Sequence, residues 1–459
     1  RQIIRVGFNM EAGLIEIGNI PERHLRDEFI ILVDQPAYDS VRRNAPQADM
    51  QEFDGWARSF YTVEGIMASI LQFSKTLIHE PTDPIWNDVK RETLMKIGSL
   101  FPQVQSLPSE GGFDHVPFES SSSAGYGYDG KKGDGNNFHR AKSIANAAVR
   151  KFSEDIDNQG YDYAVSHLIQ QGTPDIAFTR TQLAKLPSIK VRIVFGEALH
   201  NILIEGLSAA PLLEAFKRMD TFYFTGTGPN NLRSKNLTQD EHKRKMGLSA
   251  LTGKAFDASV QLWEIDHAFN CIQQLLALPT ELSRLAFLFT RESFKQRKLA
   301  DPNGILWMRK GGIPSGSYYT NIIGSVINYN RIEYVCKRLG LQKTSCYVQG
   351  DDSLIHITRD AKPDLTQLQM LGEQFGWTLN IPKCSLTQDS QLVTFLGRSQ
   401  MHQLIIRERL KVLRLMCFPE YKVEDPKIST TRVKAIARDA GWSDPVYNKI
   451  YLQLKRLYG

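Results

Sequence analysis

The sequence contains few cysteines and no long hydrophobic run. Its five cysteines are scattered over 459 residues, and none belongs to a Cys-x-x-Cys pair. This distribution excludes a disulfide framework and a zinc site with paired cysteine ligands, and it favours a reducing compartment in which the thiols are small buried side chains. No stretch reaches the roughly 18 consecutive apolar residues of a membrane-spanning helix, so we expect no membrane partner. The cysteines are Cys271, Cys336, Cys346, Cys384 and Cys417.

The sequence also lacks an initiator methionine, a signal peptide and an acidic block. Because it starts at Arg1 with a short mixed segment, we expect a fragment or a processed product. There are 56 Lys and Arg against 50 Asp and Glu, which gives a net charge of +6. A solvated surface would explain any one basic cluster, whereas four clusters without acidic counterparts favour a basic channel for nucleic acid. The clusters span residues 180–192, 233–245, 291–310 and 407–414.

The overall composition is that of a globular protein. Hydrophobic residues make up 42% of the chain and charged residues 23%, which excludes a wholly disordered or collagen-like chain. The length predicts two or three lobes.

Apolar periodicity and turn residues predict the main elements. A strand, two helices and a hairpin in succession predict an α+β sheet with helices on one face. The expected elements are a mixed helix and loop region over residues 1–105, helical character over 136–168, a short strand over 248–256 that ends at Asp257, a helix of about 18 residues from Val260, a helix over 319–339, strands over 345–349 and 353–357, and helices over 404–459.

Residues 120–135 are rich in Gly and Ser. A flexible linker would have this composition. Tyr126, Tyr128, Lys131 and Lys132 lie among the glycines, however, and such a segment suits a loop that lets a phosphate backbone come close.

An alternating run follows within residues 185–195. In a strand, Lys190 and Arg192 would share one face, and Val191 and Ile193 would share the other. The run is therefore either an ordinary amphipathic edge strand with a protective lysine or a basic surface for phosphates.

Two adjacent carboxylates, Asp351 and Asp352, follow Gly350 at the expected tip of the hairpin. Like charges this close raise one another's pKa and destabilise the fold unless a cation binds between them. Mg²⁺ prefers one or two carboxylates together with substrate phosphates. Gly-Asp-Asp alone is also a common turn sequence, so the pair becomes informative only with the segments around it.

Taken in order, these segments resemble the motifs of viral RNA-dependent RNA polymerases over about residues 120–400. The version of motif B, together with the phrase Phe-Asp-Ala-Ser-Val-Gln, is most similar to partitivirus-like double-stranded RNA viruses, with picobirnaviruses second. The matching segments are Ser122, Ser123, Ala124, Gly125 and Tyr126 (motif G), Lys190 and Arg192 (motif F), residues 256–260 (motif A), 312–320 (motif B), 350–352 (motif C), 375–383 (motif D) and 394–398 (motif E).

The resemblance implies a right-hand α+β fold with fingers, palm and thumb, in which helices back an antiparallel palm sheet. It assigns residues 1–248 to an N-terminal region and fingers, 249–400 to the palm with a finger insertion at about 278–310, and 401–459 to the thumb. Because this last segment is short for a thumb, we expect the natural chain to continue beyond residue 459.

The resemblance also implies roles for individual residues. Asp351 and Asp352 would hold Mg²⁺, with Mn²⁺ as the alternative ion, for two-metal nucleotidyl transfer. Asp257 would bind the ribose 2′-hydroxyl.

The remaining expected roles concern phosphates, the nucleotide and RNA. Lys383 would donate a proton to pyrophosphate, although it could be an ordinary loop lysine. Lys190 and Arg192 would bind the triphosphate, and Ser315, Gly316 and Thr320 would form a flexible nucleotide-binding loop. Residues 122–126 would contact RNA.

One position departs from the family pattern. Motif A usually carries two aspartates, and Thr252 stands where the first, a metal ligand, is expected. Thr is a poor Mg²⁺ ligand, and Lys254 adds a positive charge beside it. Three explanations remain: a polymerase silenced at one ligand, a rearranged site that uses Asp257, or an RNA-binding protein without catalysis. Gly324 is a second departure, because picornavirus-like enzymes carry Asn there.

The expected partners are template RNA, product duplex, nucleoside triphosphates and a viral capsid protein, in the host cytoplasm and inside the virion. A reverse transcriptase would carry Tyr-x-Asp-Asp, whereas Val348-Gln349-Gly350 precedes the aspartates here. This alternative is therefore disfavoured.

Overall fold

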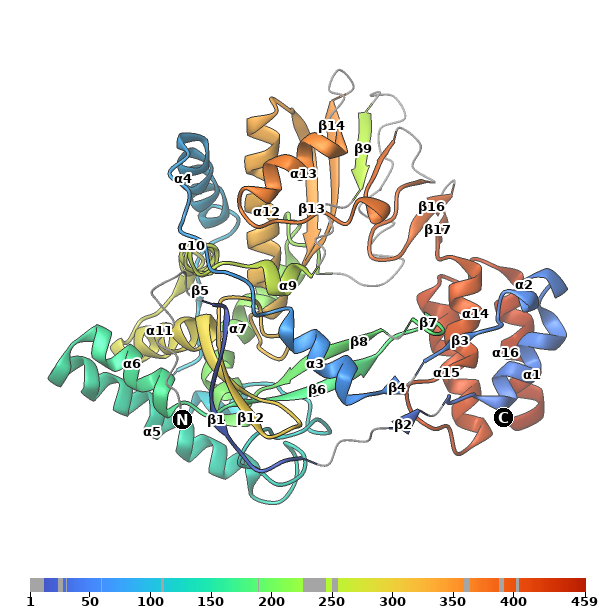
Figure 1. Ribbon diagram of the computed structural model, residues 1–459, viewed down its shortest axis with the longest axis horizontal. Coiled ribbons are helices and arrows are strands. Elements are labelled where there is room, and N and C mark those ends of the chain that lie inside the picture. The colour runs from blue at the N-terminus through green and yellow to red at the C-terminus, as the bar shows by residue number, and fades with distance from the viewer. Residues whose placement is uncertain are drawn as a thin grey trace, which may run out of the picture.

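A five-stranded and a four-stranded sheet organise the chain in this computed structural model (Figure 1). The structure describes residues 12–23, 28–29, 31–58, 60–108, 111–188, 190–225, 245–249, 255–358, 364–387, 392–401 and 404–459.

The five-stranded sheet joins segments from three distant parts of the chain. Its order is β1-β12-β11-β6-β8, with only β11 and β6 parallel. Helices pack together beside it, α5 and α7 each contacting α11. The strands are β1 (Leu14–Asn19), β6 (Asp175–Thr181), β8 (Val191–Gly196), β11 (Gln296–Ala300) and β12 (Ile305–Lys310), and the helices are α3 (Val63–Leu71), α5 (Asn137–Gln159), α6 (Tyr161–Gln171), α7 (Leu199–Arg218) and α11 (Glu281–Lys295).

The four-stranded sheet is antiparallel throughout, in the order β13-β14-β9-β15. Helix α12 packs on β13 and also contacts α4 and α10, so it is buried on several sides (Figure 1). The elements are β9 (Lys245–Ser249), β13 (Lys343–Gln349), β14 (Asp352–Thr358), β15 (Ser385–Thr387), α4 (Pro84–Gly98), α10 (Leu262–Gln273), α12 (Thr320–Arg338) and α13 (Leu365–Glu373).

Three C-terminal helices form a separate core with an N-terminal helix. In Figure 1, the red C-terminal helices lie beside α1 in blue, and the core includes Val41, Leu413, Val433 and Tyr447. Asp34 begins α1 by accepting a hydrogen bond from the backbone N–H of Ala37. The helices are α1 (Gln35–Asn44), α14 (Arg409–Cys417), α15 (Pro426–Asp439) and α16 (Pro445–Tyr458).

Short elements connect these parts. They are β2 (Glu28–Phe29), β3 (Trp56–Ala57), β4 (Phe60–Tyr61), β5 (Val104–Gln105), β7 (Ala184–Lys185), β10 (Leu276–Ala277), β16 (Ser399–Met401), β17 (Leu404–Ile406), α2 (Gln47–Gln51), α9 (Phe256–Ser259), and the 3₁₀ turns η1 (Gly112–His115) and η2 (Ile381–Lys383).

Several of the expected elements are confirmed. The mixed α+β class is observed, as are the 319–339 helix, the hairpin around Gly350, and the helices that follow residue 404. Four of the five cysteines are buried, as expected, and Cys384 is half-buried. None of the helices in the described ranges combines the length and apolar composition needed to cross a membrane.

Other expectations were wrong. Asp257 does not end a strand: β9 stops at Ser249, residues 250–254 lie outside the described residues, and Asp257 lies in the short helix α9. The helix of about 18 residues expected from Val260 covers only Leu262–Gln273. The helical character expected over 136–168 is observed, in two helices that meet at Gly160, whose φ is 88°. The region 1–105, expected to be helix and loop, also contributes β1 to the larger sheet.

Asp34 provides a test of the contact between the two ends of the chain. Its buried carboxylate pairs with Arg432 and accepts hydrogen bonds from Ser429 and Ala37. Because removal of one partner leaves a buried group without its counterpart, Asp34→Ala should lower the free energy of unfolding of the C-terminal helices by about 3 kcal/mol.

The matched control is Asp425→Ala, which removes an exposed N-cap of α15 and should lower that free energy by only about 1 kcal/mol. Hydrogen exchange of α15 and α16 would measure both effects. Equal effects of the two substitutions would contradict this account of the interface.

Candidate active site

The tip of the β13–β14 hairpin is held by helix α12. The hydroxyl of Ser325 accepts a hydrogen bond from the Gly350 N–H at 2.7 Å, and the Asn328 side-chain amide donates to the Gly350 carbonyl at 3.0 Å. Gly350 has φ of 61°, a left-handed conformation that favours glycine. The position of Asp351 and Asp352 is therefore set by both backbone groups of the residue before them.

Three carboxylates come together here. Burial raises the pKa of Asp352 to about 7, although its Oδ2 accepts a hydrogen bond from the Leu396 N–H at 2.7 Å. Burial raises the pKa of Asp351 as well. The Asp257 side chain is exposed, yet the protein atoms around it displace water, which raises its pKa to about 6. The negative charge of Asp351 adds to this rise. The three predicted acids therefore share one electrostatic environment.

Cations surround the carboxylates from separate elements. Arg192 of β8 lowers the pKa of Asp257 and of Asp351, and Lys383 lowers the pKa of Asp351 and of Asp352. Arg192 also lies directly opposite Arg180 in the β6–β8 pair. Like charges at such a position destabilise a sheet, which is typical of a surface that binds an anion.

The basic cluster 407–414, which the sequence assigns to a channel for nucleic acid, supplies a further cation near this group. Lys411 of α14 has its pKa lowered by burial first, and Arg407, Lys383 and Lys190 lower it further. The structure therefore brings the C-terminal helices, the β8 segment and the Lys383 segment to the same region.

The 312–317 loop packs against the end of β8. The Ser315 hydroxyl accepts a hydrogen bond from the Phe195 N–H at 3.0 Å. A Cβ at Gly316 would lie 1.9 Å from the Phe195 carbonyl oxygen, so only glycine fits. The Thr320 hydroxyl donates to the carbonyls of Pro314 and Ser317, which gives it a structural contact within the loop.

Buried Glu205 on α7 holds the other side of this loop. Its Oε2 accepts hydrogen bonds from the Ser317 hydroxyl at 2.7 Å and from the Tyr318 N–H at 2.9 Å. Arg297 lies among Glu205, Glu197 and Asp175. Because Glu205 belongs to an otherwise apolar stretch of α7, its unusual polarity was the only sequence signal for it.

The 120–135 segment is an ordered loop, so the flexible-linker alternative was wrong. The Lys132 N–H donates to the Ser122 carbonyl at 2.8 Å, and the Leu199 N–H donates to the Ala124 carbonyl at 2.9 Å. A Cβ at Gly125 would lie 2.6 Å from the Ala198 Cα. The loop that contains Ser122, Ser123 and Tyr126 is thus docked onto the segment that follows β8.

The donor set suits a divalent cation only in part. Burial is the main cause of the raised pKa values of the three acids, even beside Arg192 and Lys383, and a hard cation bound among them would favour their charged forms. Within the described residues, however, no group of three His, Cys, Asp or Glu side chains is arranged to hold a metal. Thr252, the position of the missing family carboxylate, lies outside the described residues.

Comparison with known families agrees with this arrangement. The family model described as viral RNA-dependent RNA polymerase matches residues 32–455. The chain belongs to the viral RNA-dependent RNA polymerases. A search of curated proteins found no significant match. The family implies RNA-directed RNA polymerase activity, with RNA and nucleotides as substrates.

Steric exclusion at Gly316 gives a direct test of the polymerase loop. Gly316→Ala should push the loop away from β8 and weaken nucleotide binding by about tenfold or more, the consequence of overpacking a close contact. Gly18→Ala is the matched control, since a Cβ there meets nothing within 4 Å. Equilibrium titration with a nucleoside triphosphate would measure both, and unchanged affinity in Gly316→Ala would refute the steric argument.

His200 gives a pH test of the docked loop. Its Nδ1 lies 2.9 Å from the Tyr128 hydroxyl, and burial lowers its pKa to about 4, with Arg297 and Arg140 contributing. The folded polymerase therefore binds this proton less readily than the unfolded chain. Stability should be complete above about pH 6.5 and decline by about 3 kcal/mol as the pH falls towards 4.

His200→Gln should remove this part of the decline, as measured by denaturant unfolding at several pH values. His139→Gln, at an exposed position of α5, is the control and should leave the wild-type dependence intact. An identical pH dependence in wild type and His200→Gln would contradict the assignment.

Proposed function

We propose that this chain copies RNA by two-metal nucleotidyl transfer, as the polymerase of a partitivirus-like double-stranded RNA virus. The observation that carries the proposal is the convergence of Asp257, Asp351 and Asp352 with Arg192 and Lys383. Carboxylates beside cations suit phosphoryl transfer, in which the protein positions the reactants and neutralises charge. A picobirnavirus-like origin is the second choice.

The four-stranded sheet would then be the palm, the β6–β8 region with its sheet the fingers, and the C-terminal helices the thumb. Asp351 and Asp352 would hold Mg²⁺ or Mn²⁺. When bound, the ion would supply charge neutralisation and an activated primer 3′-oxygen.

The chain's own residues would bind and orient the other groups. Arg192 and Lys190 would bind the triphosphate, and Lys383 would hold a proton for the pyrophosphate oxygen. The Asp257 carboxylate would accept a hydrogen bond from the ribose 2′-hydroxyl. The Asp257 backbone carbonyl accepts a hydrogen bond from the Ile313 N–H at 2.9 Å, which ties Asp257 to the 312–317 loop. The 120–135 loop, with Ser122, Ser123, Ala124, Gly125 and Tyr126, would guide the template.

Activity depends on Thr252. We expect wild type to incorporate nucleotides into a short RNA template–primer slowly, and Thr252→Asp to raise the rate by about tenfold or more, because a carboxylate is a far better Mg²⁺ ligand than a hydroxyl. Radiolabelled nucleotide incorporation with Mg²⁺ and with Mn²⁺ would measure this. Asp351→Asn should abolish incorporation in both backgrounds.

The control is Asp425→Ala, which lies on the exposed start of α15 and should leave incorporation unchanged. If neither wild type nor Thr252→Asp incorporates nucleotides, the second candidate applies: a polymerase-shaped protein that binds RNA without turnover. Its binding would weaken steeply with salt, since it would rest on phosphate contacts. The Thr252 departure is the observation that favours this candidate.

The remaining proposals concern a protein partner and the location in which the chain acts. We infer that a capsid protein is a partner and that the protein acts in the host cytoplasm and inside the virion. Both rest on the family resemblance alone.

A further inference from the structure

Arg331 of α12 is a buried cation outside the groups considered so far. Its side chain binds Glu264 through two hydrogen bonds, Nε to Oε1 at 2.7 Å and Nη2 to Oε2 at 2.8 Å. Its Nη1 donates to the Ser259 hydroxyl at 3.1 Å. Bidentate pairs of this kind fix geometry as well as charge.

These contacts reach the segment that carries Asp257. Ser259 is the last residue of α9, and its hydroxyl donates to the Phe256 carbonyl at 2.7 Å. Glu264 in turn accepts the Gln261 N–H at 2.9 Å and caps α10. Arg331 thus holds both the end of α9 and the start of the helix that follows.

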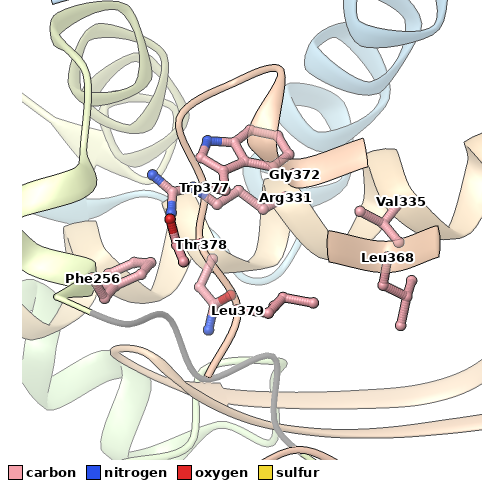
Figure 2. A pocket seen from close by; sticks show the side chains of 9 residues that line it. Phe256, Arg331, Val335, Leu368, Gly372, Trp377, Thr378 and Leu379 are labelled. Atoms are coloured by element: carbon pink, nitrogen blue, oxygen red, sulfur yellow. The ribbon is translucent and has the colours of Figure 1, made fainter. Parts of the chain in front are cut away.

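The guanidinium lies over two aromatic rings. Its central carbon lies 4.9 Å from the Phe256 ring centre and 5.0 Å from the Trp377 ring centre. Trp377 precedes the segment that leads to Lys383. Figure 2 shows Arg331 beside Trp377 and Thr378, with Phe256 on the same side of the pocket and Val335 and Leu368 on the far side.

A small cavity of about 30 Å³ lies next to these contacts. Its lining includes Phe256, Asn328, Thr378 and Leu379. The Thr378–Leu379 segment therefore borders this cavity next to the contact between Trp377 and Arg331.

Arg331 and Asn328 lie three residues apart on one face of α12. Asn328 binds the Gly350 carbonyl, and Arg331 binds the α9 segment. One helix face therefore fixes the segment before Asp351 and the segment that carries Asp257.

We propose that Arg331 is a positioning residue that sets Asp257 and the Lys383 segment relative to the Asp351 hairpin, and thereby determines ribose selection without touching the nucleotide. This rests on the proposed function, in which Asp257 accepts the 2′-hydroxyl. A buried ion pair is seldom needed for stability alone, and here its fixed geometry supplies the orientation.

The test compares binding of a ribonucleoside triphosphate and its 2′-deoxy analogue. Both are titrated into the complex of the protein with template and a primer whose 3′-hydroxyl is absent, so that binding is measured without turnover. Arg331→Lys keeps the charge but loses the bidentate pair and the stacking. It should reduce the ratio of the two affinities by about tenfold, the scale of one lost charge-assisted contact.

Ser259→Ala is a milder variant that removes one hydroxyl without changing the charge, and it should reduce the ratio by about threefold. Arg432→Lys, which alters a comparable pair with Asp34 far from the site, is the control and should leave the ratio unchanged. If folded Arg331→Lys and Ser259→Ala both keep the wild-type ratio, the proposal is overturned.

A second readout separates this proposal from the proposed function. Hydrogen exchange in Arg331→Lys should accelerate in residues 255–264 and 376–383 together, while Arg432→Lys should not accelerate it there. If the wild-type protein binds neither triphosphate, the proposed function is contradicted. The hydrogen-exchange rates of residues 255–264 and 376–383 would still test whether Arg331 positions these segments. Unchanged exchange in both segments would overturn the positioning role.

Discussion

The packing of helix α12 against the β13–β14 hairpin is the constraint on which the site depends. A hairpin tip with two adjacent acids would tend to open, because like charges repel. Ser325 and Asn328 bind both backbone groups of Gly350 and prevent this. The helix can do so because it is buried along most of its length, between the sheet, α4 and α10. The rigidity of the acidic turn thus comes from a hydrophobic core.

A cluster of buried charged side chains positions the 312–317 loop against the five-stranded sheet. Arg297 on β11 lies among Asp175 on β6, Glu197 after β8, and Glu205 on α7. Burial raises the pKa of Glu197 well above its usual range, although Arg297 lowers it. Charges taken out of water contribute little net stability, but they permit few arrangements. Because Glu205 also binds Ser317 and Tyr318, the arrangement of the cluster determines where the 312–317 loop lies.

What could be predicted from the sequence was local. The hairpin and helix α12 follow from turn residues and apolar periodicity, which act over a few neighbouring positions. The acids and cations of the site were found through the order of their segments. Helix α9 was missed because four residues are too few to show a helical period, and the apolar run before it favours a strand.

The sequence pattern did not predict which distant segments contact one another. Asp34 meets Arg432 across almost the whole chain, and Arg331 meets Glu264 from a separate helix. A buried Arg or Glu in a helix looks like any surface residue until the fold shows what covers it. The supporting residues of the site were therefore hidden, whereas the residues that would touch substrate were visible as motifs.

The backbone shows where this support is used. Ala255 and Leu396 are non-glycine residues with positive φ, at 51° and 53°. Such conformations cost about 1–3 kcal/mol each and persist only where the surroundings enforce them. Ala255 precedes α9 and Asp257, and the Leu396 N–H binds Asp352. Two of the three such residues in the described part of the chain therefore flank the carboxylate group, and the third, Trp442, lies between α15 and α16. The Ser259 N–H donates to the Ala255 carbonyl at 3.0 Å, and Arg331 binds the Ser259 hydroxyl. Helix α12 holds the hairpin that carries Asp352, so the geometry of the acids reflects the core around them as well as their own turns.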